Sequence, residues 1–329
     1  MTVLVAEEEV ALELESRVPS AASPASVYAD RSFVFPGRPA GLVVASDGTS
    51  FVSDATSRTI WRVDRSGNRT VAFARAGGLS DAPGTRQRVR SPAGLALAFD
   101  GTLVVADSTG HQVWAVSPEG APRLLAGSVS GYRDGPGGSA LFRHPSDVAI
   151  GPDGTYYVAD AGNHCIRAIT SDGVVSTLAG SIYDYGDGRG PGGRFRQPLA
   201  LDVDADGTCY VADTGNNAVR RIAPDGQVTT VAGSPPGGDA DGVGVEVGLR
   251  WPTGIAVGHG GHLWVADHGN GAVRRIEQTG VSTTTLRLTG RRWPGAMALT
   301  PDGEVVVVAV VLDDVRLPQT CLTTAGVDR

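Results

Sequence analysis

The sequence predicts an all-β fold, a six-bladed β-propeller in which each blade is a four-stranded antiparallel sheet. A fixed repeat is the main observation: a short apolar run such as YVAD ends in aspartate at intervals of 53, 53, 53 and 54 residues. The five aspartates are Asp54, Asp107, Asp160, Asp213 and Asp267. A period that covers most of a chain indicates one supersecondary unit stacked many times. No segment shows the 3.6-residue periodicity of a helix over ten or more residues.

The fourth repeat shows the unit most clearly. Apolar segments at 199–203, 209–212, 218–222 and 228–232 are expected to be strands, separated by Asp206-Gly207, the DTGN segment and a PDG turn. Asp-Gly pairs supply the positive φ angles that tight hairpins need. Four short strands joined in this way form an antiparallel meander, and radial packing of such sheets hides most strand edges.

The repeat also sets the domain boundaries. Residues 36–329 are expected to form the propeller, with blades that start near Pro39, Pro92, Pro145, Pro198, Pro252 and Pro294. Residues 1–35 form an N-terminal arm, with a candidate strand at 10–14 and a Ser/Pro/Ala tether at 16–26. Two ring closures remain open: the arm adds a strand to the last blade, or residues 321–325 supply that strand.

Composition excludes several function classes. The net charge of −7 and the pI near 5.4 disfavour a nucleic-acid partner, which would require a basic surface. No apolar run is long enough to span a membrane, and Glu7, Glu8 and Glu9 stand where a secretory signal needs a basic start. Three cysteines without a CxxC pair are read as free thiols, so a cytoplasmic monomer is expected. The chain has no lysine, which excludes Schiff-base chemistry.

The repeat motifs resemble the NHL repeat family of β-propellers. The segments PTGIAV, DGTYYVADAGNHCIRAI and VSTLAG carry the resemblance, which covers roughly residues 38–317 and is strongest in repeats three to five. It implies the propeller fold. It does not imply one function, because the family includes protein-binding, RNA-binding and sensor domains, and related six-bladed propellers include lactonases and lyases.

Strand direction predicts which face carries the function. The links from second to third strand and from one blade to the next share a face, and those links are long and unusual in sequence. Four of the five inter-blade links contain an aspartate (Asp81, Asp134, Asp187 and Asp241), and all five end in an arginine two residues before the blade's proline. These arginines are Arg90, Arg143, Arg196, Arg250 and Arg292. Either they pair with the aspartates, or several point inward and bind a carboxylate or phosphate group.

Departures from the repeat suggest a pocket. The fifth inter-blade link is about eleven residues shorter than the others, and the sixth blade lacks the aspartate. Arg250, Trp251, Arg292, Trp293 and His268 adjoin these defects. They are candidate ligand-binding residues, together with Arg143, His144, Arg196, Tyr183 and Tyr185 on the long loops. The tryptophans alternatively only fill the space left by the shorter loop.

Two functions follow from this surface. The first is a binding module that holds a protein partner or small anionic ligand on the long-loop face, with Tyr132, Tyr183 and Tyr185 in contact. The second is an enzyme (a lyase, lactone hydrolase or cyclase) with His268 or Asp147 as acid or base. No metal-ligand set is assigned, because a catalytic zinc site usually needs three protein ligands; a channel metal ion is not excluded. No organic cofactor motif is present, since no helix follows the PGG runs to present its N-terminus to a phosphate.

Overall fold

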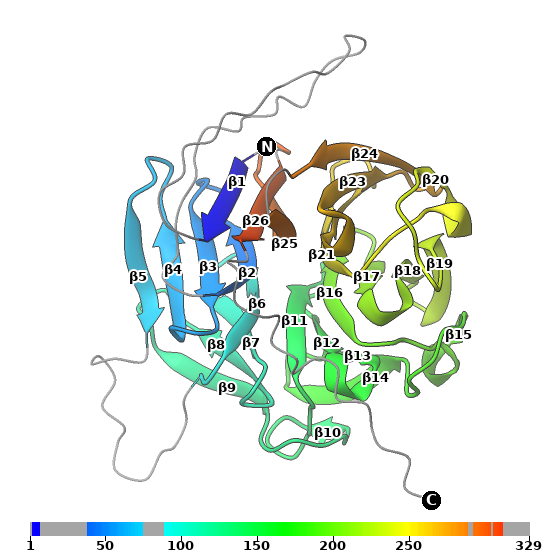
Figure 1. Cartoon of the computed structure of the whole chain (residues 1–329). Helices are drawn as coiled ribbons and strands as arrows, with labels where there is room; N and C mark the ends of the chain where they lie inside the picture. The colour runs from blue at the N-terminus through cyan, green and yellow to red at the C-terminus, as the bar shows by residue number, and fades with distance from the viewer. Residues whose placement is uncertain (1, 7–37, 75–88, 289–291, 304, 312–329) are drawn as a thin grey trace, which may run out of the picture.

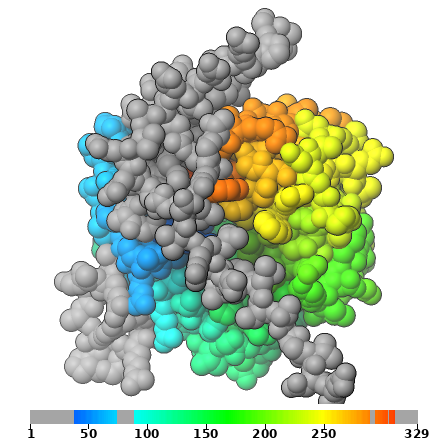
Figure 2. All heavy atoms as spheres, viewed as in Figure 1, coloured from blue at the N-terminus to red at the C-terminus, as the bar shows by residue number. Residues whose placement is uncertain are grey.

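The protein is a β-propeller, a ring of radially arranged sheets (Figure 1). The structure, a computed structural model, describes residues 2–6, 38–74, 89–288, 292–303 and 305–311. Its innermost strands are β2, β6, β11, β16, β21 and β25, and each contacts the next around a closed circle. Figure 2 shows the same view in space-filling form, with the blades following one another around the ring from blue to orange.

Five blades are antiparallel sheets of four strands in meander order. The first two consist of β2 (Pro39–Val44), β3 (Ser50–Asp54), β4 (Thr59–Val63) and β5 (Arg69–Ala74), then β6 (Pro92–Leu97), β7 (Leu103–Asp107), β8 (Gln112–Val116) and β9 (Pro122–Gly127). The third consists of β11 (Pro145–Ile150), β12 (Tyr156–Asp160), β13 (Cys165–Ile169) and β14 (Val174–Ala179). The fourth and fifth consist of β16 (Pro198–Val203), β17 (Cys209–Asp213), β18 (Ala218–Ile222) and β19 (Gln227–Gly233), then β21 (Pro252–Val257), β22 (Leu263–Asp267), β23 (Ala272–Ile276) and β24 (Val281–Arg287).

The remaining sector is different, which corrects the expectation of six four-stranded blades. Here β25 (Arg292–Leu299) and β26 (Val305–Val311) form an antiparallel pair, and β1 (Thr2–Ala6) lies beside β26 in parallel. The described residues therefore form five complete blades and one three-stranded sheet. The candidate strands at 10–14 and 321–325 lie outside the described residues.

Local sequence explains the strands of the regular blades. In the fourth repeat the observed strands agree with the expected ones to within a residue or two, and Gly207 takes the positive φ of 80° that its hairpin requires. Side chains alternate along each innermost strand. Val148 on β11 packs in a cluster with Ala96 of the preceding blade, while Ala149 packs in a cluster with Leu201 of the following blade. One apolar core thus runs from blade to blade.

The inter-blade loops contain short strands that the sequence does not predict. β10 (Gly135–Pro136), β15 (Gly188–Arg189) and β20 (Gly242–Val243) each pair with the outermost strand of the following blade. In the second of these loops, Gly190 donates its N–H to the carbonyl of Gly226 in a turn between outer strands. The Asp-Gly part of each loop therefore follows the outer edge of a blade, and only the end of the loop returns to the innermost strand.

Helical structure is limited to single turns in the described segments. These are η1 (Ala161–Asn163), η2 (Gly190–Gly192), η3 (Thr214–Asn216), η4 (Gly244–Glu246) and η5 (His268–Asn270). Within these segments, no helix has the length and apolar character needed to cross a bilayer. η1, η3 and η5 replace the expected turns after the repeat aspartates.

Candidate functional site

The repeat aspartates fasten the start of each blade. All five are completely buried, and each accepts a backbone N–H from the segment that leads into its innermost strand, at 2.7–3.0 Å. In the third blade, Arg143 N donates to Asp160, and Asn163 donates its side-chain amide to the same carboxylate.

The expected cap on the following turn is present in the first two blades, where Asp54 accepts the backbone N–H of Thr56 at 3.0 Å and Asp107 that of Gly110 at 3.1 Å. In blades three to five the aspartate makes no such bond to the backbone of the turn, and the asparagine side chain of the turn donates to the carboxylate instead. The repeat aspartates are structural residues.

Three buried arginines complete these caps, and the sequence reasoning missed them. Arg167, Arg220 and Arg274, on the third strands of blades three to five, are fully buried. Each forms an ion pair with the repeat aspartate of its own blade, at 2.8, 2.9 and 2.6 Å respectively. The signal was present in the sequence: these arginines recur with the same period as the aspartates, seven residues after them.

The loop aspartates also bind these buried arginines. Asp187 contacts Arg220 at 2.8 Å and Asp241 contacts Arg274 at 2.7 Å, while Asp134 makes the equivalent contact with Arg167. These three aspartates were expected to form ion pairs with the arginines before each proline, but they bind the buried third-strand arginines instead. Asp81 lies outside the described residues.

Aromatic rings enclose two of the buried guanidiniums. Arg167 lies between Tyr132 and Phe142, each ring centroid 5.0 Å from the guanidinium carbon. Arg220 lies between Tyr185 and Phe195 at 5.1 and 5.3 Å. Tyr185, expected as a ligand contact, thus covers a structural arginine, although one face of Tyr132 stays accessible with 51% of the residue exposed.

The arginines before the prolines lack a carboxylate partner in the part of the chain that is described. Arg90, Arg143, Arg196 and Arg250 are exposed, and no carboxylate of the described residues lies within 4.0 Å of their side-chain nitrogens. The stems of Arg143, Arg196 and Arg250 pack over the glycine of the adjacent 3-10 turn; a Cβ added to Gly215 would lie 2.5 Å from Cγ of Arg196. The pairing of these arginines with loop aspartates is therefore not observed. The side chain of Arg292 lies outside the described residues.

Two histidines at matching repeat positions lie between these arginines. His164 Nδ1 accepts the backbone N–H of Gln197 at 3.2 Å, and His111 Nδ1 accepts that of His144 at 3.1 Å. A neutral imidazole that accepts at Nδ1 carries its proton on Nε2, so both rings present an N–H donor. Burial lowers the pKa of His164, and the charges of Arg143 and Arg196 lower it further.

A third ring joins this group on the loop of the fourth blade. Tyr183 is 50% exposed, stacks on the guanidinium of Arg196 at 4.6 Å and contacts the ring of His164 edge-on at 4.8 Å. Its hydroxyl also accepts from Arg196 Nε. His144, a further candidate, packs edge-on against His111 with centroids 4.7 Å apart. The structure thus brings together four of the predicted ligand-binding residues: Arg143, His144, Arg196 and Tyr183.

Only some of the residues predicted to form a pocket between the fifth blade and the three-stranded sheet lie together. His268 and Trp293 lie together, with ring centroids 6.4 Å apart. The Nδ1 atom of His268 lies 2.9 Å from the carbonyl oxygen of Pro294, which joins the fifth blade to the next sheet, and burial lowers the pKa of this histidine. Trp251 is 57% exposed and its backbone N–H binds Asn217 Oδ1 at 2.9 Å. No ring contact joins Trp251 to His268 within the described residues.

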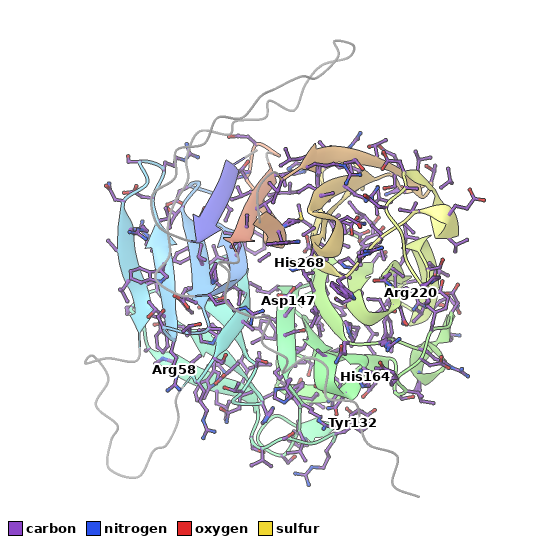
Figure 3. All side chains as sticks on the ribbon, in the orientation of Figure 1. Arg58, Tyr132, Asp147, His164, Arg220 and His268 are labelled. Atoms are coloured by element: carbon purple, nitrogen blue, oxygen red, sulfur yellow. The ribbon has the colours of Figure 1, made fainter. Side chains whose placement is uncertain are left out.

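The central channel contains a cavity of about 290 Å³. Apolar side chains of all six innermost strands line it, and its only ionisable lining residues in the described chain are Asp147 and Asp202. Burial raises the pKa of Asp147 to about 7 and that of Asp202 to about 6, and the charge of a neighbouring aspartate contributes to each rise. Asp147 accepts the backbone N–H groups of Val148 and Leu201, which links β11 to β16. Figure 3 shows Asp147 near the centre of the ring and Tyr132 near its edge.

His268 is not among the residues that line this cavity. The structure therefore does not place the two candidate catalytic residues in one pocket. In the part of the chain that is described, no group of three or more His, Cys, Asp or Glu side chains is arranged to hold a metal ion.

Comparison with known proteins agrees with this architecture. Residues 142–169 and 249–276 match the model of the NHL repeat family. The chain is a β-propeller with NHL repeats. It is 29% identical over 73% of its length to the protein Suppressor of quenching 1, chloroplastic, of Arabidopsis thaliana, and 29% identical over 74% to teneurin-m of Drosophila melanogaster. The aligned parts cover 25% and 10% of those relatives, so the chain corresponds to a small section of each.

Solved structures confirm the fold at low sequence identity. A gluconolactonase from Xanthomonas campestris superimposes with a TM-score of 0.61 at 16% identity, covering 83% of each chain. This likeness establishes the propeller and does not transfer an activity.

Proposed function

We propose that this propeller is a binding module that holds a protein partner on its long-loop face. The observation that carries the proposal is the exposure of large apolar and aromatic side chains on the inter-blade loops. Val129, Tyr132, Ile182, Tyr183 and Trp251 are each at least half exposed. Tyrosine, tryptophan and arginine are enriched at the energetic centres of protein interfaces, and Arg196, which has no carboxylate partner among the described residues, stacks on Tyr183.

An enzyme acting on an anionic substrate in the channel is less well supported. The channel cavity carries two carboxyl groups and no basic side chain in the described residues, so an anion entering it would be repelled. Asp147 and His268 are each hydrogen-bonded to the backbone of the neighbouring sheet. These contacts are sufficient to explain both residues as structural links between blades.

Site-specific photo-crosslinking in the producing cells tests the proposal. A photoreactive residue replacing Ile182 is expected to capture a partner, while the same residue replacing the fully exposed Phe99, on a turn of the opposite face, is not. The captured protein is then purified, and Ile182→Asp is expected to weaken its binding at least about tenfold while Phe99→Asp leaves it unchanged. Equal capture from both positions, or unchanged binding by Ile182→Asp, would contradict the proposal.

A further inference from the structure

We propose that an arc of hydrogen-bond donors on the long-loop face binds an acidic peptide segment of the partner protein. The donor arc consists of Arg90, His111, Arg143, His164 and Arg196. This inference rests on the proposed function, which it deepens by naming the chemistry that the partner presents.

The arc is contiguous and spans blades two to four. Burial lowers the pKa of His111; the adjacent His144 and the charges of Arg90 and Arg143 lower it further. The pKa of His164 is likewise lowered by burial and by the charges of Arg143 and Arg196. Each histidine therefore lies within electrostatic reach of two arginines, and Arg143 is shared by both.

Every polar group that the arc presents is a donor. The guanidinium groups have no acceptor capacity, and the backbone bond to Nδ1 of each histidine leaves only the Nε2–H free. The nearby carboxylates are already occupied: Asp134 binds Arg167, Asp187 binds Arg220, and Asp184 binds Arg194 at 2.6 Å. Arginines without a carboxylate partner among the described residues favour an anionic ligand, although Nε of Arg196 also donates to the hydroxyl of Tyr183.

The arc has a structural boundary at the next repeat. Asn217 occupies the repeat position that His111 and His164 occupy in the earlier repeats. Both the oxygen and the nitrogen of its side-chain amide form hydrogen bonds within the protein. Its Oδ1 accepts the N–H of Trp251 and its Nδ2 donates to the carbonyl of Pro236 at 2.9 Å. The donor pattern is therefore local to one side of the ring and is not a general consequence of the repeat.

Surrounding residues favour a peptide over a nucleic acid. Apolar Val129 and Ile182 and the ring of Tyr183 flank the arc, and they suit the apolar side chains between carboxylates in a peptide. The chain's net charge of −7 would repel a long polyphosphate backbone, whereas a short acidic segment needs only the local field. Charge complementarity at short range therefore selects the partner.

Fluorescence anisotropy with labelled synthetic probes tests the inference on the full chain. The probes are a peptide alternating glutamate with glycine, the same peptide with glutamine in place of glutamate, and a thymidine oligonucleotide of equal length. The wild-type protein is expected to bind the glutamate peptide most tightly. The double variant Arg143→Gln/Arg196→Gln is expected to weaken that binding about tenfold, from two exposed ion pairs of roughly 0.7 kcal/mol each.

A matched control has the same change in net charge. Arg62→Gln/Arg123→Gln removes two exposed arginines of β4 and β9 that lie outside the arc, and it is expected to leave affinity unchanged. Both double variants should retain the wild-type unfolding midpoint, because Arg143 and Arg196 bind the repeat aspartates through their backbone N–H groups.

Three outcomes would overturn the inference. These are equal loss from both double variants, equal binding of the glutamate and glutamine peptides, and tighter arc-dependent binding of the oligonucleotide. If the Ile182 experiment succeeds while the glutamate peptide fails, the partner surface stands and only the partner's acidic chemistry is wrong. If Ile182→Asp has no effect on partner binding, the proposed function itself fails, whatever the peptide does.

Discussion

Replacing Asp213 by alanine should cost far more stability than removing an exposed ion pair of the same blade. The Asp213 carboxylate is fully buried and accepts three hydrogen bonds, from Arg196 N at 2.8 Å, Asn216 Nδ2 at 2.8 Å and Arg220 Nη1 at 2.9 Å. Its removal leaves these donors without their acceptor in a site closed to water. Each such loss costs about 1–3 kcal/mol.

The remaining contacts of Arg220 limit the damage. The guanidinium keeps Asp187 at 2.8 Å and the carbonyls of Arg194 and Gly186 at 2.8 and 2.7 Å. Removing one partner of a buried pair costs about 3–5 kcal/mol, and the retained Asp187 places the expected cost of Asp213→Ala near the lower limit, about 3 kcal/mol.

The control is Asp225→Ala. It removes an ion pair with Arg189 that is 3.6 Å long and more than half exposed on both sides, so a cost below about 1 kcal/mol is expected. Urea denaturation at pH 7.5, followed by fluorescence, measures both. If Asp213→Ala lowers the unfolding free energy no more than Asp225→Ala does, the repeat aspartate does not fasten the blade and the argument from burial is wrong.

Three further predictions concern the channel, the arm and His268. The pKa of Asp147 is raised to about 7 in the fold, so the stability that its protonated form contributes is complete below about pH 4 and is lost by pH 7. The unfolding free energy of Asp147→Asn relative to wild type should therefore rise by roughly 2–4 kcal/mol between pH 4 and pH 8. A difference that does not change with pH would contradict this. Deleting residues 1–6 removes β1 from the buried strand β26 and should lower the unfolding free energy by about 2 kcal/mol, measured by urea denaturation; an unchanged midpoint would show that β1 does not contribute. His268→Ala should cost about 1 kcal/mol through the lost bond to Pro294 and leave affinity for the captured partner unchanged; a selective loss of affinity would instead make His268 a binding residue.

The repeat made the fold predictable, because each period had to satisfy the same local requirements. A structural role for Asp213 and its equivalents could be assigned from spacing alone, and the turn glycines followed from the need for positive φ. The last sector could be predicted only in part, since Asp302-Gly303 indicates the hairpin between β25 and β26 but Val305–Val311 carries no repeat aspartate to define the next neighbour. The parallel placement of β1 beside it depends on long-range packing.

The site was less predictable, because ion pairing depends on side-chain direction. Both the arginines before the prolines and those on the third strands recur with the repeat, so spacing could not show which set is buried. One signal was available: Trp61 and Trp114 replace the third-strand arginine in the first two repeats. A tryptophan at a repeat position favours burial, and Trp114 is fully buried. In the first repeat, where no arginine stands at this position, Asp54 Oδ2 has no partner among the described residues.

The central claim is that the described loop carboxylates bind buried arginines and leave Arg143 and Arg196 of the donor arc without a carboxylate partner among the described residues. Modification with phenylglyoxal, followed residue by residue with peptide mass spectrometry, measures this directly. Arg143 and Arg196 should react rapidly and become protected by the glutamate peptide, while Arg167 and Arg220 should react only as the protein unfolds. Slow modification of Arg143 and Arg196 in the free protein, at the rate of the buried pair, would contradict the account.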